Sequence, residues 1–208
     1  MTPDLETHYR HLFTTALVRI AEKLEAHILD HLEDLPRVDR VSARAKDPQR
    51  FLAKAAKLTP EGSSKYSAPL VQIQDQIGAR VVVFYPSDVE IVSDRIDDFF
   101  AKIEKKDLVP DSEWQFGYFG RHWVLALPRD VVPGDVDPQS VPGFFELQVK
   151  TLFQHAWSEA SHDLAYKPPE SLTADQQRRF AYTSAQAWGA DRVFNELRGE
   201  LIGEEFSE

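Results

Sequence analysis

The stretch that decides the fold is GFFELQVKTLFQHAWSE, residues 143–159. Its first half alternates apolar and polar side chains, which is the period-two pattern of a half-buried strand. The apolar positions are Phe145, Leu147 and Val149, and the polar positions are Glu146, Gln148 and Lys150. Its second half has the spacing of a helix, expected from about residue 151 to 166. A polar strand face is typical of a solvated sheet or of a ligand site, and alternation alone does not separate the two.

Three further segments carry strand patterns. An acid and a glycine precede the β-rich run from Arg80 to Tyr85, which predicts the central strand. Residues 40–46 alternate so that one face is basic, and RHWVLALP, residues 121–128, alternates again.

Helical spacing flanks these strands on both sides. An amphipathic helix is expected over residues 4–35, and Asp47 followed by proline predicts another helix that runs to about Leu58. Ser87 and Glu90 form a capping-box pattern for a helix that runs to about Ile103. A last helix is expected over residues 173–201, with an interruption at Gly189, and residues 59–70 read as a loop. The fold class is therefore α+β, a mixed sheet of about four to five strands flanked by helices.

The composition bounds the class of protein. The 208 residues carry no repeat, fit a single domain over 1–208, and are 42% hydrophobic and 28% charged, as in folded globular proteins. The net charge of -10 argues against broad nonspecific binding of duplex nucleic acid. No apolar run approaches a membrane span and no signal-peptide pattern opens the chain, so we expect a cytoplasmic protein that does not bind membranes. The absence of cysteine excludes thiolate chemistry.

Basic residues gather around the predicted helix that follows residue 47. The helix carries Arg50, Lys54 and Lys57 on one face, and Arg44 and Lys46 arrive from the preceding strand. Unpaired N–H groups and a positive dipole end at a helix start favour polyphosphate binding. The alternative is a solvated charged face, and spacing alone does not overturn it.

Two carboxylates are candidates for metal binding. Asp75 lies at the start of the predicted central strand, and Glu146 lies on the polar face of a later strand. If these strands are neighbours, both acids point into one cleft and can hold magnesium (Mg²⁺) together with substrate phosphates. Taken singly, each acid is better explained as structural.

Two aromatic or histidine patterns are weaker signals. In FGYFGRHW, residues 116–123, glycines flank Tyr118, whose ring can stack on a base or pack at a strand start. A helical stripe carries His155, Glu159, His162 and Tyr166. A histidine metal site is one hypothesis for it, but helical histidines more often join hydrogen-bond networks.

Taken together and in this order, these segments resemble the synthetase domain of the RelA/SpoT family over about residues 40–168. Its ATP motif, R-x-K-x-x-x-S-x-x-x-K, falls on Arg44, Lys46 and Lys54, with Arg50 at the serine position. The motif D-x-x-G-x-R falls on Asp75, Gly78 and Arg80, and G-Y-x-S-x-H falls on Gly117, Tyr118 and His122 with Gly120 at the serine position. The strand motif E-x-Q-x-R-T falls on Glu146, Gln148, Lys150 and Thr151, and the helix that follows reads AWSEASHDLAYK.

The resemblance implies a nucleotidyltransferase-like synthetase fold and an enzyme that transfers pyrophosphate from ATP to the 3′ hydroxyl of GDP or GTP, making (p)ppGpp and releasing AMP. For the donor it implies that Arg44 and Arg80 flank the adenine and that cations from the ATP motif hold the phosphates. Those cations are Lys46 and Lys54, joined here by Arg50.

For the metal and the acceptor, the resemblance implies that Asp75 and Glu146 bind magnesium and are catalytic. The residues expected to bind the acceptor are Tyr118, His122 and Gln148.

Departures from the family pattern leave the acceptor open. Trp114 stands where many relatives carry a lysine for acceptor phosphates, and Gly120 replaces a serine. Some small members of the family are toxins that modify the tRNA 3′ end or an adenine nucleotide, so tRNA and an antitoxin remain alternative partners. A nucleotide-binding protein without catalysis is the third reading. The sequence does not decide whether the chain forms a homo-oligomer.

Overall fold

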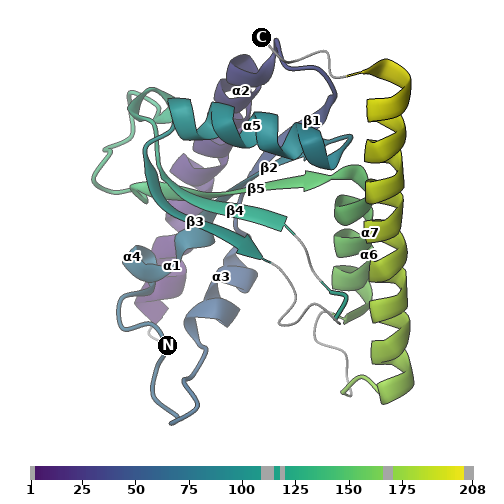
Figure 1. Cartoon of the computed structure of the whole chain (residues 1–208). Coiled ribbons are helices and arrows are strands. Elements are labelled where there is room, and N and C mark those ends of the chain that lie inside the picture. Colours follow the sequence, from purple (N-terminus) through teal and green to yellow (C-terminus); the bar gives the residue numbers. More distant parts are fainter. Residues whose placement is uncertain (1–2, 109–114, 118–119, 166–170, 204–208) are drawn as a thin grey trace.

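The chain folds around a five-stranded mixed sheet in the order β1-β2-β5-β4-β3 (Figure 1). The computed structural model describes residues 3–108, 115–117, 120–165 and 171–203. The strands are β1 Val38–Ala45, β2 Ile77–Val83, β3 Lys102–Leu108, β4 Gly120–Ala126 and β5 Phe144–Thr151. β2 and β5 are parallel, and the other neighbouring pairs are antiparallel. This is the α+β class that the sequence predicts.

Helices cover the sheet and extend beyond one end of it (Figure 1). α1 Pro3–Leu12 continues through a π-helical turn, Phe13–Leu17, into α2 Val18–Leu32. The other helices are α3 Pro48–Ala55, α4 Pro69–Gln72, α5 Pro86–Phe99, α6 Leu152–Ala165 and α7 Ala174–Ile202. α6 and α7 contact each other, and within the described ranges no helix is long and apolar enough to cross a membrane.

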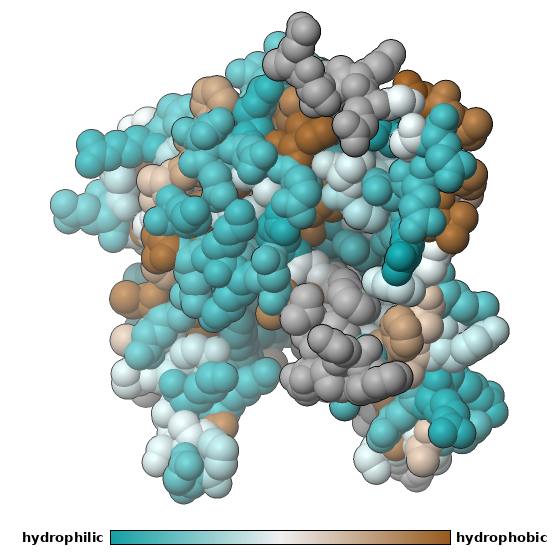
Figure 2. Space-filling model, in the orientation of Figure 1, coloured by the Kyte–Doolittle hydropathy of each residue, from teal (hydrophilic) through white to brown (hydrophobic). Residues whose placement is uncertain are grey.

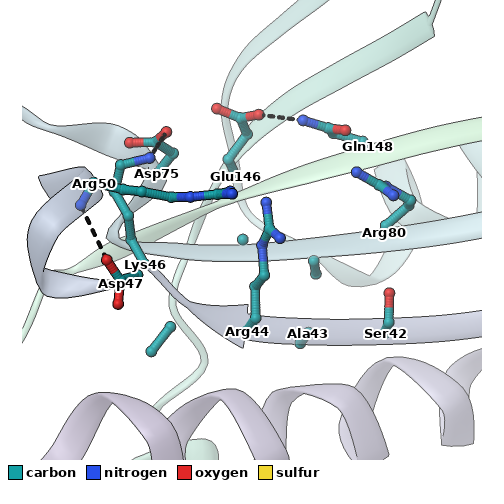
Figure 3. Close-up of a pocket in the computed structure, with 13 residues that line it drawn as sticks. Ser42, Ala43, Arg44, Lys46, Asp47, Arg50, Asp75, Arg80, Glu146 and Gln148 are labelled. Atoms are coloured by element: carbon teal, nitrogen blue, oxygen red, sulfur yellow. Dashed lines mark hydrogen bonds and ion pairs between the residues drawn. The ribbon is translucent and has the colours of Figure 1, made fainter. Parts of the chain in front are cut away.

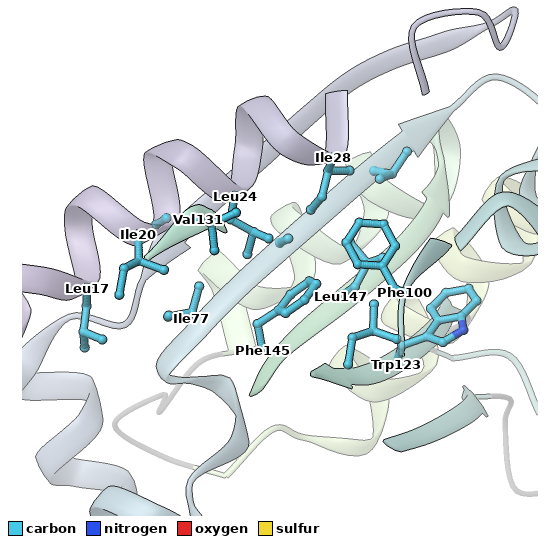
Figure 4. Close-up of a cluster of buried hydrophobic side chains, with 14 of the residues drawn as sticks. Leu17, Ile20, Leu24, Ile28, Ile77, Phe100, Trp123, Val131, Phe145 and Leu147 are labelled. Atoms are coloured by element: carbon cyan, nitrogen blue, oxygen red, sulfur yellow. The ribbon is translucent and has the colours of Figure 1, made fainter. Parts of the chain in front are cut away.

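The hydrophobic core lies between one face of the sheet and the helices α2 and α5 (Figure 4). β5 contributes Phe145, Leu147 and Val149, all with 0% exposure. Ile20, Leu24 and Ile28 recur along α2 at steps of four and meet this face. The alternation of β5 therefore resolves as predicted, with its apolar side in the core and Glu146 and Gln148 on the opposite side.

Two predictions about the strands are wrong. The sheet centre is β5 rather than the run predicted as central, which forms β2 in second place. Residues 102 and 103 were expected at the end of a helix but begin β3, because α5 ends at Phe99 and the Lys-rich segment pairs along the sheet edge with β4. Lysine on an edge strand hinders further pairing, and Ile103 is 58% exposed there.

Several helix boundaries also differ from the prediction. α5 begins at Pro86, and Asp88 rather than Glu90 accepts the N–H of Tyr85 at 3.1 Å, since proline favours the first helical position. α3 ends at Ala55, three residues before the expected end. α7 continues through Gly189 without interruption, because neighbouring turns keep their backbone hydrogen bonds.

Candidate active site

The polar face of the sheet brings the predicted site residues into two adjacent rows. Strand pairing places Gly78 beside both Arg44 and Glu146, and it places Arg80 beside both Ser42 and Gln148. His122 of β4 lies opposite Gln148 on the far side of β5. Side chains in register on one face point the same way, so residues far apart in sequence share one surface.

A cavity of about 500 Å³ opens on this face (Figure 3). Its lining comes from β1, β2, β5, the start of α3 and the turn that carries Asp75. The lining residues are Ser42, Ala43, Arg44, Ala45, Lys46, Asp47, Arg50, Asp75, Gly78, Ala79, Arg80, Glu146 and Gln148. Sequence reasoning missed the three alanines among them, because alanine at a strand position gives no signal that distinguishes a cavity wall from a packed face.

Cations enter the cavity from separate elements. Arg44 comes from β1, Arg50 from the first turn of α3 and Arg80 from β2, and all three point into the space (Figure 3). Asp47 caps α3 as predicted, accepting the N–H groups of Gln49 and Arg50 at 2.9 and 3.1 Å. The cap occupies these two N–H groups, so the cationic side chains themselves supply the attraction for anions.

Asp75 is held between two lysines. Lys46 Nζ lies 2.7 Å from Asp75 Oδ2, and Lys54 Nζ lies 3.0 Å from Oδ1. Burial alone would raise the pKa of Asp75, but the hydrogen bond and charge of Lys46 and the charge of Lys54 outweigh burial and lower it. Asp75 is therefore ionised at neutral pH, and Lys54 reaches the site through this ion pair.

Glu146 is the other predicted metal-binding carboxylate that lines the cavity. Gln148 Nε2 donates to Glu146 Oε1 at 2.7 Å, and His122 Nδ1 lies 3.4 Å from the same oxygen. Burial raises the pKa of Glu146, the contacts with His122 and Gln148 lower it by more, and the charge of Asp75 opposes them, so the net shift is downward. Asp75 and Glu146 line the same cavity, so each carboxylate disfavours the charge of the other.

Magnesium fits this donor set. It prefers oxygen ligands and commonly uses one or two carboxylates together with substrate phosphates. Asp75 and Glu146 supply such oxygens on one cavity wall (Figure 3). In the part of the chain that the structure describes, no cluster of three or more histidines and acids forms a metal cage, and the stripe of His155, Glu159 and His162 is not one.

Buried Lys150 and partly buried Arg80, both from the sequence motifs, connect the sheet to α6. Lys150, at the position of the family's arginine, is 2% exposed and donates to Ser158 Oγ at 3.1 Å. Burial and the neighbouring charge of Arg80 lower the pKa of Lys150 to about 7. Arg80 itself contacts Glu159 and His155 of α6, which sequence reasoning grouped as one stripe without finding what that stripe faces. Tyr118 and Trp114 lie outside the described residues.

A mixed sheet that gathers cations and carboxylates around one cavity is typical of proteins that bind polyphosphate with a divalent cation. Residues 43–171 match the family model described as the region found in RelA / SpoT proteins. The chain belongs to this family, and the resemblance seen in its motifs is confirmed.

Individual relatives agree with this assignment. The chain is 25% identical over 179 residues to the GTP pyrophosphokinase YjbM of Bacillus subtilis (strain 168), covering 84% of this chain and 78% of that protein. The fold is similar to that of small alarmone synthetase 1 from Bacillus subtilis bound to its product pppGpp, with a TM-score of 0.68, 21% identity, and coverage of 96% and 97% of the two chains. A GTP pyrophosphokinase family protein from Streptococcus pneumoniae gives a TM-score of 0.69, 22% identity, and coverage of 98% and 96%.

Proposed function

We propose that this chain is a magnesium-dependent pyrophosphokinase that transfers pyrophosphate from ATP to the 3′ hydroxyl of GDP or GTP. The observation that carries this proposal is the cavity on the polar sheet face, where residues from three separate family motifs meet. They are Arg44, Lys46 and Arg50 from the first motif, Asp75 and Arg80 from the second, and Glu146 and Gln148 from the third. The family membership and the relative named as a GTP pyrophosphokinase support the same activity.

The donor nucleotide is assigned to the cationic side of the cavity. Arg44 and Arg80 flank the adenine in this proposal, and Lys46 and Lys54 hold the phosphates. Arg50, which replaces the family's serine and lines the cavity, adds a further charge beside them. Guanidinium groups suit this work because they stack on flat rings and donate several hydrogen bonds to phosphate.

The two carboxylates are assigned to the reaction centre. Asp75 and Glu146 would hold magnesium, which neutralises charge on the transferring phosphates when bound. Glu146 also accepts the proton of the 3′ hydroxyl, and its lowered pKa keeps it ready to do so at neutral pH. The 3′ oxygen bonds to the β-phosphorus, the bond from that phosphorus to the α,β-bridging oxygen breaks, and AMP leaves.

The acceptor nucleotide is assigned to the side of Glu146 that faces His122 of β4. In this proposal Gln148 and His122, which both contact Glu146 Oε1, orient the ribose end of the acceptor. Tyr118 stays a proposed stacking residue for the base. We also propose a cytoplasmic location, where free nucleotides are available as both substrates. We further propose that residues 1–208 form one domain.

Product analysis tests the proposal. Purified protein with magnesium and labelled ATP is offered GDP, GTP, ATP and deacylated tRNA in separate reactions. We expect a guanosine 3′-pyrophosphate and an equal amount of AMP. Label on tRNA or on an adenine nucleotide alone would replace the acceptor assignment, and no transfer to any acceptor would leave only nucleotide binding.

A further inference from the structure

The side chain of Arg80 contacts two residues of α6. Its Nη1 donates to Glu159 Oε1 at 2.6 Å and lies 3.2 Å from His155 Nδ1, while the side chain lines the cavity and is 22% exposed. Its Nε is buried and has no hydrogen-bond partner among the described residues. One edge of the guanidinium is therefore anchored to α6, and Nε still needs an acceptor.

The contact with Arg80 fixes the protonation state of His155. A guanidinium only donates hydrogen bonds, so Nδ1 must accept and the ring proton must sit on Nε2. Burial and the charge of Arg80 lower the pKa of His155, and Arg40 of β1 and Lys150 of β5 act in the same direction. Glu159, on the same helix, is the opposing charge. His155 is therefore neutral at neutral pH, and protonation would replace the hydrogen bond with repulsion.

The helix that presents these two residues is itself fixed to its surroundings. Lys150 donates to Ser158, which is 8% exposed, from the sheet side. Trp157 Nε1 donates to Thr183 Oγ1 of α7 at 3.1 Å from the other side. Because these contacts fix α6, the positions of His155 and Glu159 are fixed as well. The two residues can therefore fix the orientation of the Arg80 guanidinium.

We infer that His155 and Glu159 are positioning residues that hold the guanidinium of Arg80 in the orientation that receives the donor nucleotide. The inference rests on the proposed function, because it takes the cavity as the ATP site. A long arginine side chain has many rotamers, and a ligand that binds a mobile one must also order it. Holding one edge of the group leaves the nucleotide a preorganised partner.

Removing the charge of Glu159 tests its contact with Arg80. The probe is the α,β-methylene analogue of ATP, whose blocked bond prevents turnover, and the readout is its dissociation constant by calorimetry. Because Glu159 is 56% exposed, we expect Glu159→Gln to weaken binding by about fivefold rather than abolish it. Asp163→Asn makes the same charge change at an exposed position of α6 and should leave binding unchanged. Equal or tighter binding by Glu159→Gln would overturn the positioning role of Glu159.

Two substitutions at position 155 test the contact between His155 and Arg80. The readout is the pH dependence of analogue binding, which would not change if His155 were only structural. Gln can accept a hydrogen bond from Arg80 and does not titrate, whereas Ala offers no acceptor. At about pH 8, His155→Gln should bind the analogue like the unchanged protein and His155→Ala several-fold more weakly. At about pH 5.5, the unchanged protein should bind more weakly than His155→Gln, since only its residue 155 becomes charged. Titration of the analogue itself cancels in this ratio, and a ratio that does not change with pH would overturn the role of His155.

The same measurements separate this inference from the function it rests on. If the unchanged protein does not bind the analogue at all, the ATP site and the proposed function fail together with the inference. If it binds, and both Glu159→Gln and His155→Ala bind equally well at about pH 8, only the positioning role fails.

Discussion

The two faces of β5 are built from alternating residues of one strand, yet they contact their neighbours through different interactions. Toward α2 and α5 the strand presents Phe145 and its apolar neighbours to a dry core. Toward the cavity it presents Glu146 and Gln148, and α6 is joined to that side by polar contacts such as Lys150 to Ser158. Apolar burial scales with area and is nondirectional, whereas polar contacts depend on charge state and geometry. The core face should therefore govern stability, and the cavity face should govern binding and chemistry.

The sharpest test of the cavity face is Glu146→Gln. The amide keeps the size and one acceptor oxygen but cannot take a proton from the 3′ hydroxyl, so transfer should fall on the order of 10³-fold. Thermal unfolding should barely change and nucleotide binding should persist. Transfer is measured by AMP release. Undiminished AMP release would contradict the catalytic role of Glu146.

The matching test of the core face is Phe145→Ala, one residue away. Removing a fully buried ring loses its transfer free energy and leaves a cavity, which should cost about 3 kcal/mol of unfolding free energy. Below the unfolding transition, the remaining folded protein should keep its turnover per molecule within a few-fold. Urea denaturation with activity measured on the same samples checks this. Loss of turnover without loss of stability would mean that the two faces are not separable.

This separation was visible in the sequence for β5 but not for the whole sheet. Strand geometry forces alternate side chains to opposite faces, so the pattern around Glu146 predicted both faces correctly. The position of β5 at the sheet centre depends on pairing with β2 and β4, which are distant in sequence. β3 was missed because its Lys-rich edge lacks the apolar alternation of a half-buried strand.

The site was predictable to a similar extent and for similar reasons. Strand positions and family motifs identified Asp75 and Glu146 as candidates. The pairing of β2 with β5 and the turn before β2 bring the two acids to one cavity. The partner of Arg80 could not be found from spacing, because the rotation of α6 about its axis is set by packing against α7 and the sheet. The role of Tyr118 stays a prediction.

A buried acid on α7 lies on neither face of β5, and it should affect the pH dependence of stability. Asp191 is 4% exposed, accepts a hydrogen bond from Thr151 Oγ1 at 2.7 Å, and burial raises its pKa to about 6. A pKa raised above the unfolded value means that this residue contributes stability at low pH and that the contribution is lost as pH rises through about 6. Asp191→Asn removes the charge, so it should be more stable than the unchanged protein by about 1–2 kcal/mol at about pH 8.

The comparison for Asp191 is the difference in unfolding free energy between the two proteins across pH. That difference should grow from about pH 4 to about pH 6 and then level off, because only the titration of Asp191 separates the two chains. A difference that stays constant over this range would show that Asp191 keeps an ordinary pKa.

The smallest expected effect concerns the lysines that hold Asp75. Lys46 and Lys54 both form ion pairs with this carboxylate, and both are proposed to bind phosphates of the donor. Asp75→Asn removes the competing charge. Without divalent cation, binding of the α,β-methylene ATP analogue should therefore tighten about fivefold, on the order of 1 kcal/mol. With magnesium the order should reverse, because the unchanged protein gains a metal ligand that the variant lacks. Calorimetry in chelator and in magnesium measures both arms, and weaker binding by the variant in chelator would show that Asp75 orders the lysines instead of competing for them.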